Sequence, residues 1–412
     1  MANTIKLGNG NWATKEGSLL AYNDERNNFK PLPFTTTRAS SATVVNKQGL
    51  IETVGSGIPR IDFSDDANGA LLLEPFSRNL VTYSEDFTQW VNTRSSDLSG
   101  FISPTGGTNG TKVISDATVS SSHIIKSTTF TIASGQKHTY SVFVKANQLN
   151  FARLMFTDST VSNYLSVYFD LLNGTVGTSF DAGTATLDSA NIENFGNGWY
   201  RCSISGDLAT TTTASTRIYL AESDNVATFD GDGIKSIYAF GAQVEQNSYA
   251  TSYIKNEGTA LGITRVADTA SGAGNSTVIN SSEGVFYAEM SRLDVSGNES
   301  AIFLTKDSSN EIRINLADNN RLNIFVNVGG VYQVYMDNAT FNLQDYNKIA
   351  VKYKLNDYSV FVNGTKIHTD TSATVPPNMD ELKFNNPIVK TKSVQVYNTA
   401  LTDAELTTLT TI

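Results

Sequence analysis

The sequence predicts an all-β protein made of tandem antiparallel β-sandwiches that follow an irregular N-terminal region. Apolar and polar residues alternate with a period of two, in segments bounded by turn residues, from about Phe130 to Val396. Long segments with helical periodicity are absent. Charged residues make up 17% of the chain, below the ~25% of an average soluble protein, while Ser, Thr, Asn and Gly are abundant. This composition is typical of sheets that display hydroxyls and amides.

The length of 412 residues implies more than one domain, because a single hydrophobic core stops growing at ~250–300 residues. Residues Asn79–Trp90 close an irregular opening region, and the small-residue passage Asn256–Ser276 separates two strand-rich blocks. We therefore place domain boundaries near residues 85 and 265.

Strict alternation in Lys137–Ala146 predicts a strand on which Tyr140, Val142 and Val144 share one face. Three pairs of residues that readily adopt positive φ angles predict tight turns between antiparallel strands. These pairs are Asn173-Gly174, Gly329-Gly330 and Asn363-Gly364. At the C-terminus, Thr402 and Glu405 have the spacing of a capping box, which predicts a short helix beginning near Asp403.

The segment Asn194–Asp207 concentrates aromatic residues beside an arginine and the single cysteine. Alternation places Tyr200, Cys202 and Ile204 on the core face of a strand, so Cys202 is interpreted as a small buried residue. The opposite face carries Trp199 and Arg201, and only this face could meet a ligand. For Trp199 we favour a packing role.

Charge and composition exclude several classes of partner. The net charge of −10, without a cluster of Lys and Arg, argues against nucleic acid. One cysteine excludes an internal disulfide framework. The N-terminus lacks the pattern of a secretion signal, and no stretch of ~18 apolar residues could insert into a membrane, so we expect synthesis in a cytoplasm.

No catalytic signature is present, and we interpret the chain as a non-enzyme. No pair of carboxylates is singled out for glycoside hydrolysis, and nucleophile and phosphate-loop motifs are missing. The histidines His123, His138 and His368 are far apart in sequence, which gives no metal-binding pattern. Asp230 and Asp232, with their glycines, suit a plain turn better than a calcium loop.

The sequence also carries a resemblance. The stretches "RASSATVVNKQGLIETVGSGIPRIDF" and "GALLLEPFSRNLVTYSEDFTQW" resemble the opening module of bacteriophage virion proteins, mostly tail or fibre proteins. The middle block, with "YSVFVKA", "GNGWYRCSIS", "YAFGAQVEQNSYATSYI" and "TRVAD", resembles a carbohydrate-binding-module-like jelly roll. The last block, with "YSVFVNGTKIHT" and "VKTKSVQVYNTALTDAELTTL", is similar to the concanavalin-type or laminin-G-like lectin sandwich.

This resemblance implies a virion-attachment region at residues 1–85, a jelly roll at 86–258 and a lectin-like sandwich at 266–412. It implies a fibre protein of the virion that binds host surface polysaccharide, docks to other virion proteins through its N-terminal region and forms a homotrimer. Two alternatives stay open: a head fibre or capsid decoration protein with a mainly structural role, and a polysaccharide depolymerase. Jelly rolls of this kind often carry a structural calcium ion, and Glu85, Asp86 and Glu245 are the carboxylates that could converge on one, although solvated carboxylates are favoured.

Sugar sites combine an aromatic ring with amide, carboxylate and guanidinium groups at short range, usually on loops. Two segments supply this mixture, and the Trp199 strand adds two further residues. The candidate ligand-binding residues are Trp199, Arg201, Gln243, Gln246, Asn247, Tyr249, Tyr253, Tyr332, Gln333 and Tyr335.

Overall fold

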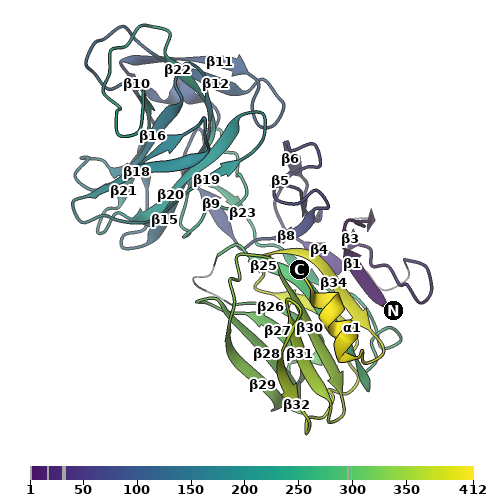
Figure 1. Cartoon of the computed structure of the whole chain (residues 1–412). Helices are drawn as coiled ribbons and strands as arrows, with labels where there is room; N and C mark the ends of the chain where they lie inside the picture. Colours follow the sequence, from purple (N-terminus) through teal and green to yellow (C-terminus); the bar gives the residue numbers. More distant parts are fainter. Residues whose placement is uncertain (1, 16–17, 30–33, 295–296, 298) are drawn as a thin grey trace. The chain divides into compact units, whose positions relative to one another are not determined.

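The computed structural model (Figure 1) describes residues 2–15, 18–29, 34–294, 297 and 299–412. Strands dominate the chain, and the predicted all-β fold class with tandem antiparallel β-sandwiches is confirmed. In the described part, the α-helical element is α1 (Asp403–Thr410).

The chain divides into two compact units. Unit 1 comprises Met1–Ser41, Val54–Pro75 and Val266–Ile412, and unit 2 comprises Ala42–Thr53 and Phe76–Arg265.

Two of the three segments predicted from the sequence each fall within one unit, and the third is shared between the units. Residues 86–258 lie within unit 2 and residues 266–412 within unit 1, whereas residues 1–85 contribute strands to both units.

Two antiparallel sheets form the sandwich of unit 1. The eight-stranded sheet runs in the order β32 (Thr365–Asp370), β31 (Tyr358–Val362), β30 (Asn347–Lys354), β25 (Glu283–Arg292), β34 (Val389–Tyr397), β8 (Ala70–Leu73) and β7 (Ile61–Asp62), and β1 (Ile5–Gly8) also pairs with β34. The five-stranded sheet runs in the order β29 (Val331–Thr340), β28 (Arg321–Val328), β27 (Asn310–Leu316), β26 (Ser300–Asp307) and β33 (Glu381–Asn385). Alternate side chains of both sheets, such as Phe286 and Ile324, meet in one buried core.

N-terminal residues complete this unit. On β1, Ile5 and Leu7 are buried in the same core, and Ile5 pairs with Val396 of β34. A smaller sheet orders β2 (Thr14–Lys15), β3 (Ser18–Leu19), β4 (Phe34–Thr37) and β24 (Thr269–Ser271).

Unit 2 is a second sandwich. Its seven-stranded sheet orders β10 (Val91–Thr93), β13 (Ile124–Lys126), β21 (Thr213–Ala221), β16 (Phe151–Asp158), β17 (Tyr164–Asp170) and β18 (Thr175–Ala182), with β14 (Phe130–Thr131) also on β21. Its six-stranded sheet orders β11 (Ser95–Phe101), β12 (Gly110–Ser115), β22 (Ser236–Glu245), β15 (Lys137–Ala146), β20 (Trp199–Asp207) and β19 (Thr186–Asn194). Shorter elements are the pair β9 (Ser77–Asn79) and β23 (Ile263–Arg265), the pair β5 (Ala42–Val45) and β6 (Ile51–Val54), and the 3-10 turn η1 (Phe87–Gln89).

Local predictions from the sequence agree with these elements. The strand Lys137–Ala146 is β15, with Tyr140, Val142 and Val144 in the core of unit 2, and Cys202 is a buried free thiol. Helix α1 begins at Asp403 with the predicted capping box in place. Each predicted turn pair separates two antiparallel strands. The left-handed backbone expected at these turns is present: Asn363 and Gly364, for example, have φ angles of 49° and 82°.

A buried ionic cluster stabilises unit 1. Arg60 Nη1 donates to Glu74 Oε2 at 2.6 Å, and its Nη2 donates to Asp268. Arg38 Nη1 approaches the other oxygen of Asp268 at 2.8 Å. The backbone N–H of Glu74 donates to Asp268 Oδ2 at 2.9 Å. In return, the backbone N–H of Asp268 donates to the Glu74 carbonyl at 2.9 Å. Four side chains that are remote in sequence are therefore joined in one network.

Within the described ranges, no helix has the length and apolar character needed to cross a membrane.

Candidate functional site

The outer face of the five-stranded sheet of unit 1 presents a group of aromatic rings. Tyr332 and Tyr335 on β29 are 51% and 58% exposed, and they pack over Phe325 of β28. The centroids of the two tyrosine rings lie 5.6 Å apart, and those of Tyr335 and Phe325 lie 5.0 Å apart. Exposed rings supported from below form a plate on which the apolar face of a sugar can stack.

A β-bulge places both tyrosines on this face. Residues three apart in a regular strand point to opposite sides of a sheet, because side chains alternate. The register between β28 and β29 shifts at Val326 and Asn327, so that Asn327 pairs with Tyr332 while Phe325 pairs with Tyr335. Val334 points into the core.

The rings continue as a row across the sheet. Register places Tyr335, Phe325, Arg313, Phe303 and Lys383 side by side on five successive strands. The Arg313 Cζ atom lies 4.4 Å from the Phe325 ring centroid and 5.7 Å from that of Phe303. Arg313 therefore lies between the Phe325 and Phe303 rings, and Lys383 Nζ lies 5.9 Å from the Phe303 ring centroid, so each cation is held over an aromatic surface. We call this surface the tyrosine face: Tyr332, Tyr335, Phe325, Arg313, Phe303 and Lys383, with Glu311, Asn327 and Glu381 in the next row.

Charges on the tyrosine face are balanced. Arg313 Nε lies 3.8 Å from Glu311 Oε1, and Lys383 Nζ lies 3.8 Å from Glu381 Oε2. Burial raises the pKa of the Glu311 carboxyl above its ordinary value, against the opposing effect of Arg313 and Lys383. A face with two cations and two carboxylates suits a neutral ligand that both donates and accepts hydrogen bonds.

Polar atoms beside the rings are available to such a ligand. Arg313 Nη2 lies 3.5 Å from the Tyr332 hydroxyl, and the Tyr335 hydroxyl lies 3.4 Å from Asp337 Oδ2. Asn327 Nδ2 donates to the Ser308 carbonyl at 3.0 Å, while its Oδ1 has no hydrogen-bond partner among the described residues. Gln333 instead accepts from Thr374 Oγ1 at 3.1 Å.

Four other residues nominated from the sequence are buried in unit 2. Trp199 and Tyr253 pack in one cluster with Phe143 and Phe240. The guanidinium of Arg201 lies over the Phe143 ring, 5.3 Å from its centroid. The buried Gln243 Nε2 donates to Glu245 Oε2 at 2.6 Å. Because their contacts are with the protein interior, we leave Trp199, Arg201, Gln243 and Tyr253 out of the candidate site.

The remaining three nominated residues follow β22 on a loop of unit 2. Gln246 is exposed, whereas Asn247 and Tyr249 are half-buried. Asn247 Nδ2 donates to Ser77 Oγ at 2.9 Å. These residues belong to unit 2, whereas Tyr332, Gln333 and Tyr335 belong to unit 1.

The carboxylates considered for calcium engage separate partners. Glu85 accepts from Tyr253 and Asn109, and Asp86 caps η1 through Thr88. Glu245 accepts from Ser77, Thr251 and Gln243. Across the part of the chain that the structure describes, no group of three or more His, Cys, Asp or Glu side chains could hold a metal ion.

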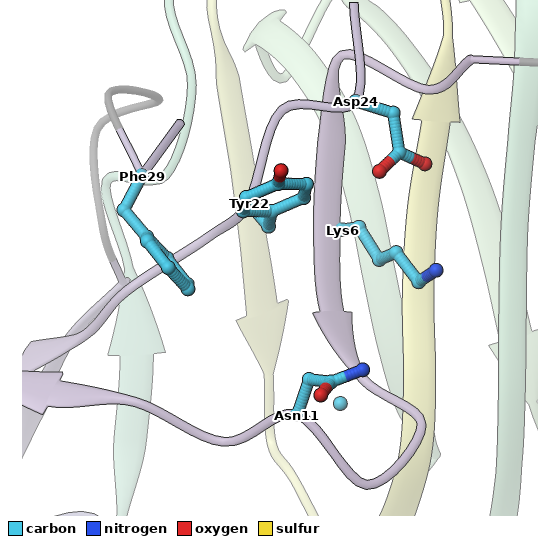
Figure 2. Close-up of a pocket in the computed structure, with 6 residues that line it drawn as sticks. Lys6, Asn11, Tyr22, Asp24 and Phe29 are labelled. Atoms are coloured by element: carbon cyan, nitrogen blue, oxygen red, sulfur yellow. The ribbon is translucent and has the colours of Figure 1, made fainter. Parts of the chain in front are cut away.

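A small pocket beside β1 is a second candidate, which the sequence did not indicate. Figure 2 shows Tyr22 and Phe29 toward one side, Lys6 and Asp24 toward the other, and Asn11 below. The rings of Tyr22 and Phe29 meet edge to face, with centroids 5.0 Å apart. The pocket holds about 240 Å³, below the ~300–1,000 Å³ of most small-molecule sites. The tyrosine face is therefore the better candidate for an extended ligand.

Comparisons with known proteins give weak likenesses. No family model matches the sequence, and no curated protein matches it. Among solved structures, the chain is similar to the Ruminococcus gnavus IT-sialidase CBM40 bound to alpha2,3 sialyllactose, at 18% identity and TM-score 0.28, over 34% of this chain and 93% of that one. It is also similar to domain 4 of the arabinanase AbnA of Geobacillus stearothermophilus, in complex with arabinotriose. The identity is 14% and the TM-score 0.29, over 40% of this chain and 83% of that one.

The Caenorhabditis elegans galectin LEC-6 is a third similar structure, at 16% identity and TM-score 0.24, over 28% of this chain and 83% of the galectin. At such identities and scores, these likenesses say nothing about what this chain binds.

Proposed function

We propose that this protein is a non-enzymatic fibre protein of a bacteriophage virion that binds host surface glycans through the tyrosine face. The observation that carries the glycan assignment is the pair of exposed rings, Tyr332 and Tyr335, beside a charge-balanced row of polar groups. Neutral sugars offer an apolar ring face to the tyrosines and hydroxyls to the neighbouring amide, carboxylate and guanidinium groups.

The phage assignment is supported by the resemblance of the sequence to virion proteins. In this proposal the N-terminal region docks to other virion proteins, and a homotrimer presents three copies of the tyrosine face. An open polar site binds each sugar chain weakly, and linked copies add ~10²–10⁴ in avidity. Immunolabelling of virions in the electron microscope tests the location: label on the tail supports the fibre, and label on the head supports a decoration protein instead.

The glycan assignment is tested with an array of neutral oligosaccharides probed by the intact protein. Replacing Tyr332 and Tyr335 with Ala is expected to weaken binding about tenfold for each ring, which corresponds to ~1.4 kcal/mol. The Tyr→Phe variants keep the rings and should retain most of the binding. Leu355→Ala removes another exposed apolar side chain of unit 1 and should change nothing.

Two outcomes would count against the proposal. If the Tyr332→Ala/Tyr335→Ala variant binds as well as the natural protein, the tyrosine face is not the site. If the natural protein binds no oligosaccharide on the array and no host cell, the decoration role becomes the better account. Shortening of host polysaccharide by the purified protein would favour the depolymerase.

A further inference from the structure

The outer face of the seven-stranded sheet of unit 2 gathers three cations. Lys126 on β13 lies directly opposite Arg217 on β21. Arg153 on β16 lies opposite Tyr219, which follows Arg217 by two residues on β21. Their sequence neighbours Ile125, Leu154 and Ile218 point into the core of unit 2. Alternation therefore turns all three cationic side chains to the outer face, where each is half-buried.

Aromatic rings surround these cations. The Arg153 Cζ atom lies 4.8 Å from the Tyr219 ring centroid, 5.6 Å from that of Tyr168 and 5.9 Å from that of Phe180. Arg153 Nε donates to Ser166 Oγ at 2.6 Å, which fixes the guanidinium in place. Phe180 is 36% exposed at the edge strand β18.

Carboxylates do not balance this face. Among the described residues, no carboxylate oxygen lies within 4.0 Å of the charged nitrogens of Lys126, Arg153 or Arg217. Two aspartates nearby in the fold accept hydrogen bonds from backbone and neutral side-chain groups instead. Asp170 accepts from the N–H groups of Leu172 and Asn173, and Asp224 accepts from the N–H and hydroxyl of Thr178.

Such an arrangement costs stability in the free protein. Like charges directly opposite each other on paired strands repel, and Lys126 and Arg217 are such a pair. The chain has a net charge of −10, so carboxylates for compensation are plentiful elsewhere. The tyrosine face of unit 1 shows the contrast, because each of its cations has a carboxylate at 3.8 Å.

We propose that this basic face, defined by Lys126, Arg153 and Arg217 with Tyr168, Tyr219 and Phe180, binds an acidic polysaccharide whose sugar units carry carboxylates. Guanidinium groups match carboxylates with paired hydrogen bonds. Neighbouring strands are ~4.8 Å apart, about the length of one sugar unit, so cations on β13 and β21 can meet carboxylates of successive units. Phe180 supplies an exposed ring for stacking. The site lies in unit 2 and does not depend on the tyrosine face.

Titration calorimetry of the full chain with polygalacturonate tests the proposal, with dextran as the neutral polymer. Polygalacturonate should bind and dextran should not compete with it. Arg217→Ala should raise the dissociation constant about tenfold, Arg217→Lys should raise it less, and Lys126→Gln should weaken binding by a similar factor. Arg78, an exposed arginine of the same unit, is the matched control, and Arg78→Ala should leave the dissociation constant unchanged.

Several results would overturn the proposal. Equal weakening by Arg78→Ala and Arg217→Ala would reveal attraction by overall charge. Equally tight binding of dextran sulfate or single-stranded DNA would reveal a general polyanion surface rather than a site for carboxylated sugars. If polygalacturonate does not bind, the proposed site for acidic polysaccharide is refuted. The Tyr332→Ala/Tyr335→Ala variant should bind polygalacturonate normally, so failure of the neutral-glycan assignment and failure of this one are distinguishable. Circular dichroism confirms that each variant is folded.

Discussion

Replacing Arg60 with Met should destabilise unit 1 by about 3–5 kcal/mol, the usual cost of removing one partner from a buried ionic network. The Arg60 side chain is fully buried, and it lies between Glu74 and Asp268, which are also buried. Burial opposes the charge of Arg60, yet the two carboxylates more than compensate and raise the pKa of the guanidinium. Met fills a similar volume without the charge, so the two buried carboxylates lose the cation between them.

Urea unfolding followed by circular dichroism measures this change. For a unit of roughly 200 residues, a slope of ~2 kcal/mol/M converts the loss into a midpoint lower by about 1.5–2.5 M. The double variant Arg60→Met/Glu74→Met should recover much of the lost unfolding free energy. It leaves no unpaired Glu74 carboxylate, and Asp268 still has Arg38 Nη1 at 2.8 Å. A loss below about 1 kcal/mol, or a double variant no more stable than Arg60→Met, would refute the network as a major source of stability.

Three further predictions concern stability. Burial raises the pKa of Glu311 above its ordinary 4.5, so the folded chain binds more protons than the unfolded chain, and the unfolding free energy falls as pH rises above 4.5. Glu311→Gln should flatten this dependence of the unfolding free energy on pH and should raise the unfolding free energy of unit 1 at pH 7. An unchanged pH dependence would contradict the prediction. Burial lowers the pKa of His138 below its ordinary 6.5, so the stability that the neutral His138 contributes is fully present above pH 6.5 and is lost as pH falls below it. His138→Asn should remove this acid-dependent loss from the unfolding transition of unit 2. Thr402→Ala removes the N-cap of α1 and should cost ~1 kcal/mol in urea unfolding, with Thr408→Ala as a control inside the helix.

Local sequence signals predicted much of the fold. Alternation located β15 to the residue, turn pairs located three hairpins, and the Thr402 capping box located α1. Each of these features depends on residues that are neighbours in sequence, so their physics is visible without a structure. The core face of β20, with Cys202 and Ile204, followed from the same alternation.

The candidate sites depend on information that the sequence does not display. Strict alternation would separate Tyr332 from Tyr335, and only the bulge at Asn327 brings them together. Aromatic residues near amides, such as Tyr253 near Gln243, looked equally suitable for a ligand, yet both are buried. Lys126, Arg153 and Arg217 are far apart in sequence, and only the pairing of three strands brings them together.

Several motifs that carry the sequence resemblances have a structural role in this chain. Arg38 begins "RASSAT", Arg60 lies in "IPRIDF", Glu74 in "LLLEPFSRN" and Asp268 ends "TRVAD". All four meet in the buried network of unit 1. A buried arginine needs nearby carboxylates, so in this chain these motifs tie Arg38, Arg60 and Glu74 to Asp268 within unit 1. They carry no information on the ligand, because none of the four side chains reaches the tyrosine face or the surface. The outer sheet faces differ in charge between the two units: a carboxylate lies 3.8 Å from each cation of the tyrosine face, whereas among the described residues the cations of the basic face have no such partner.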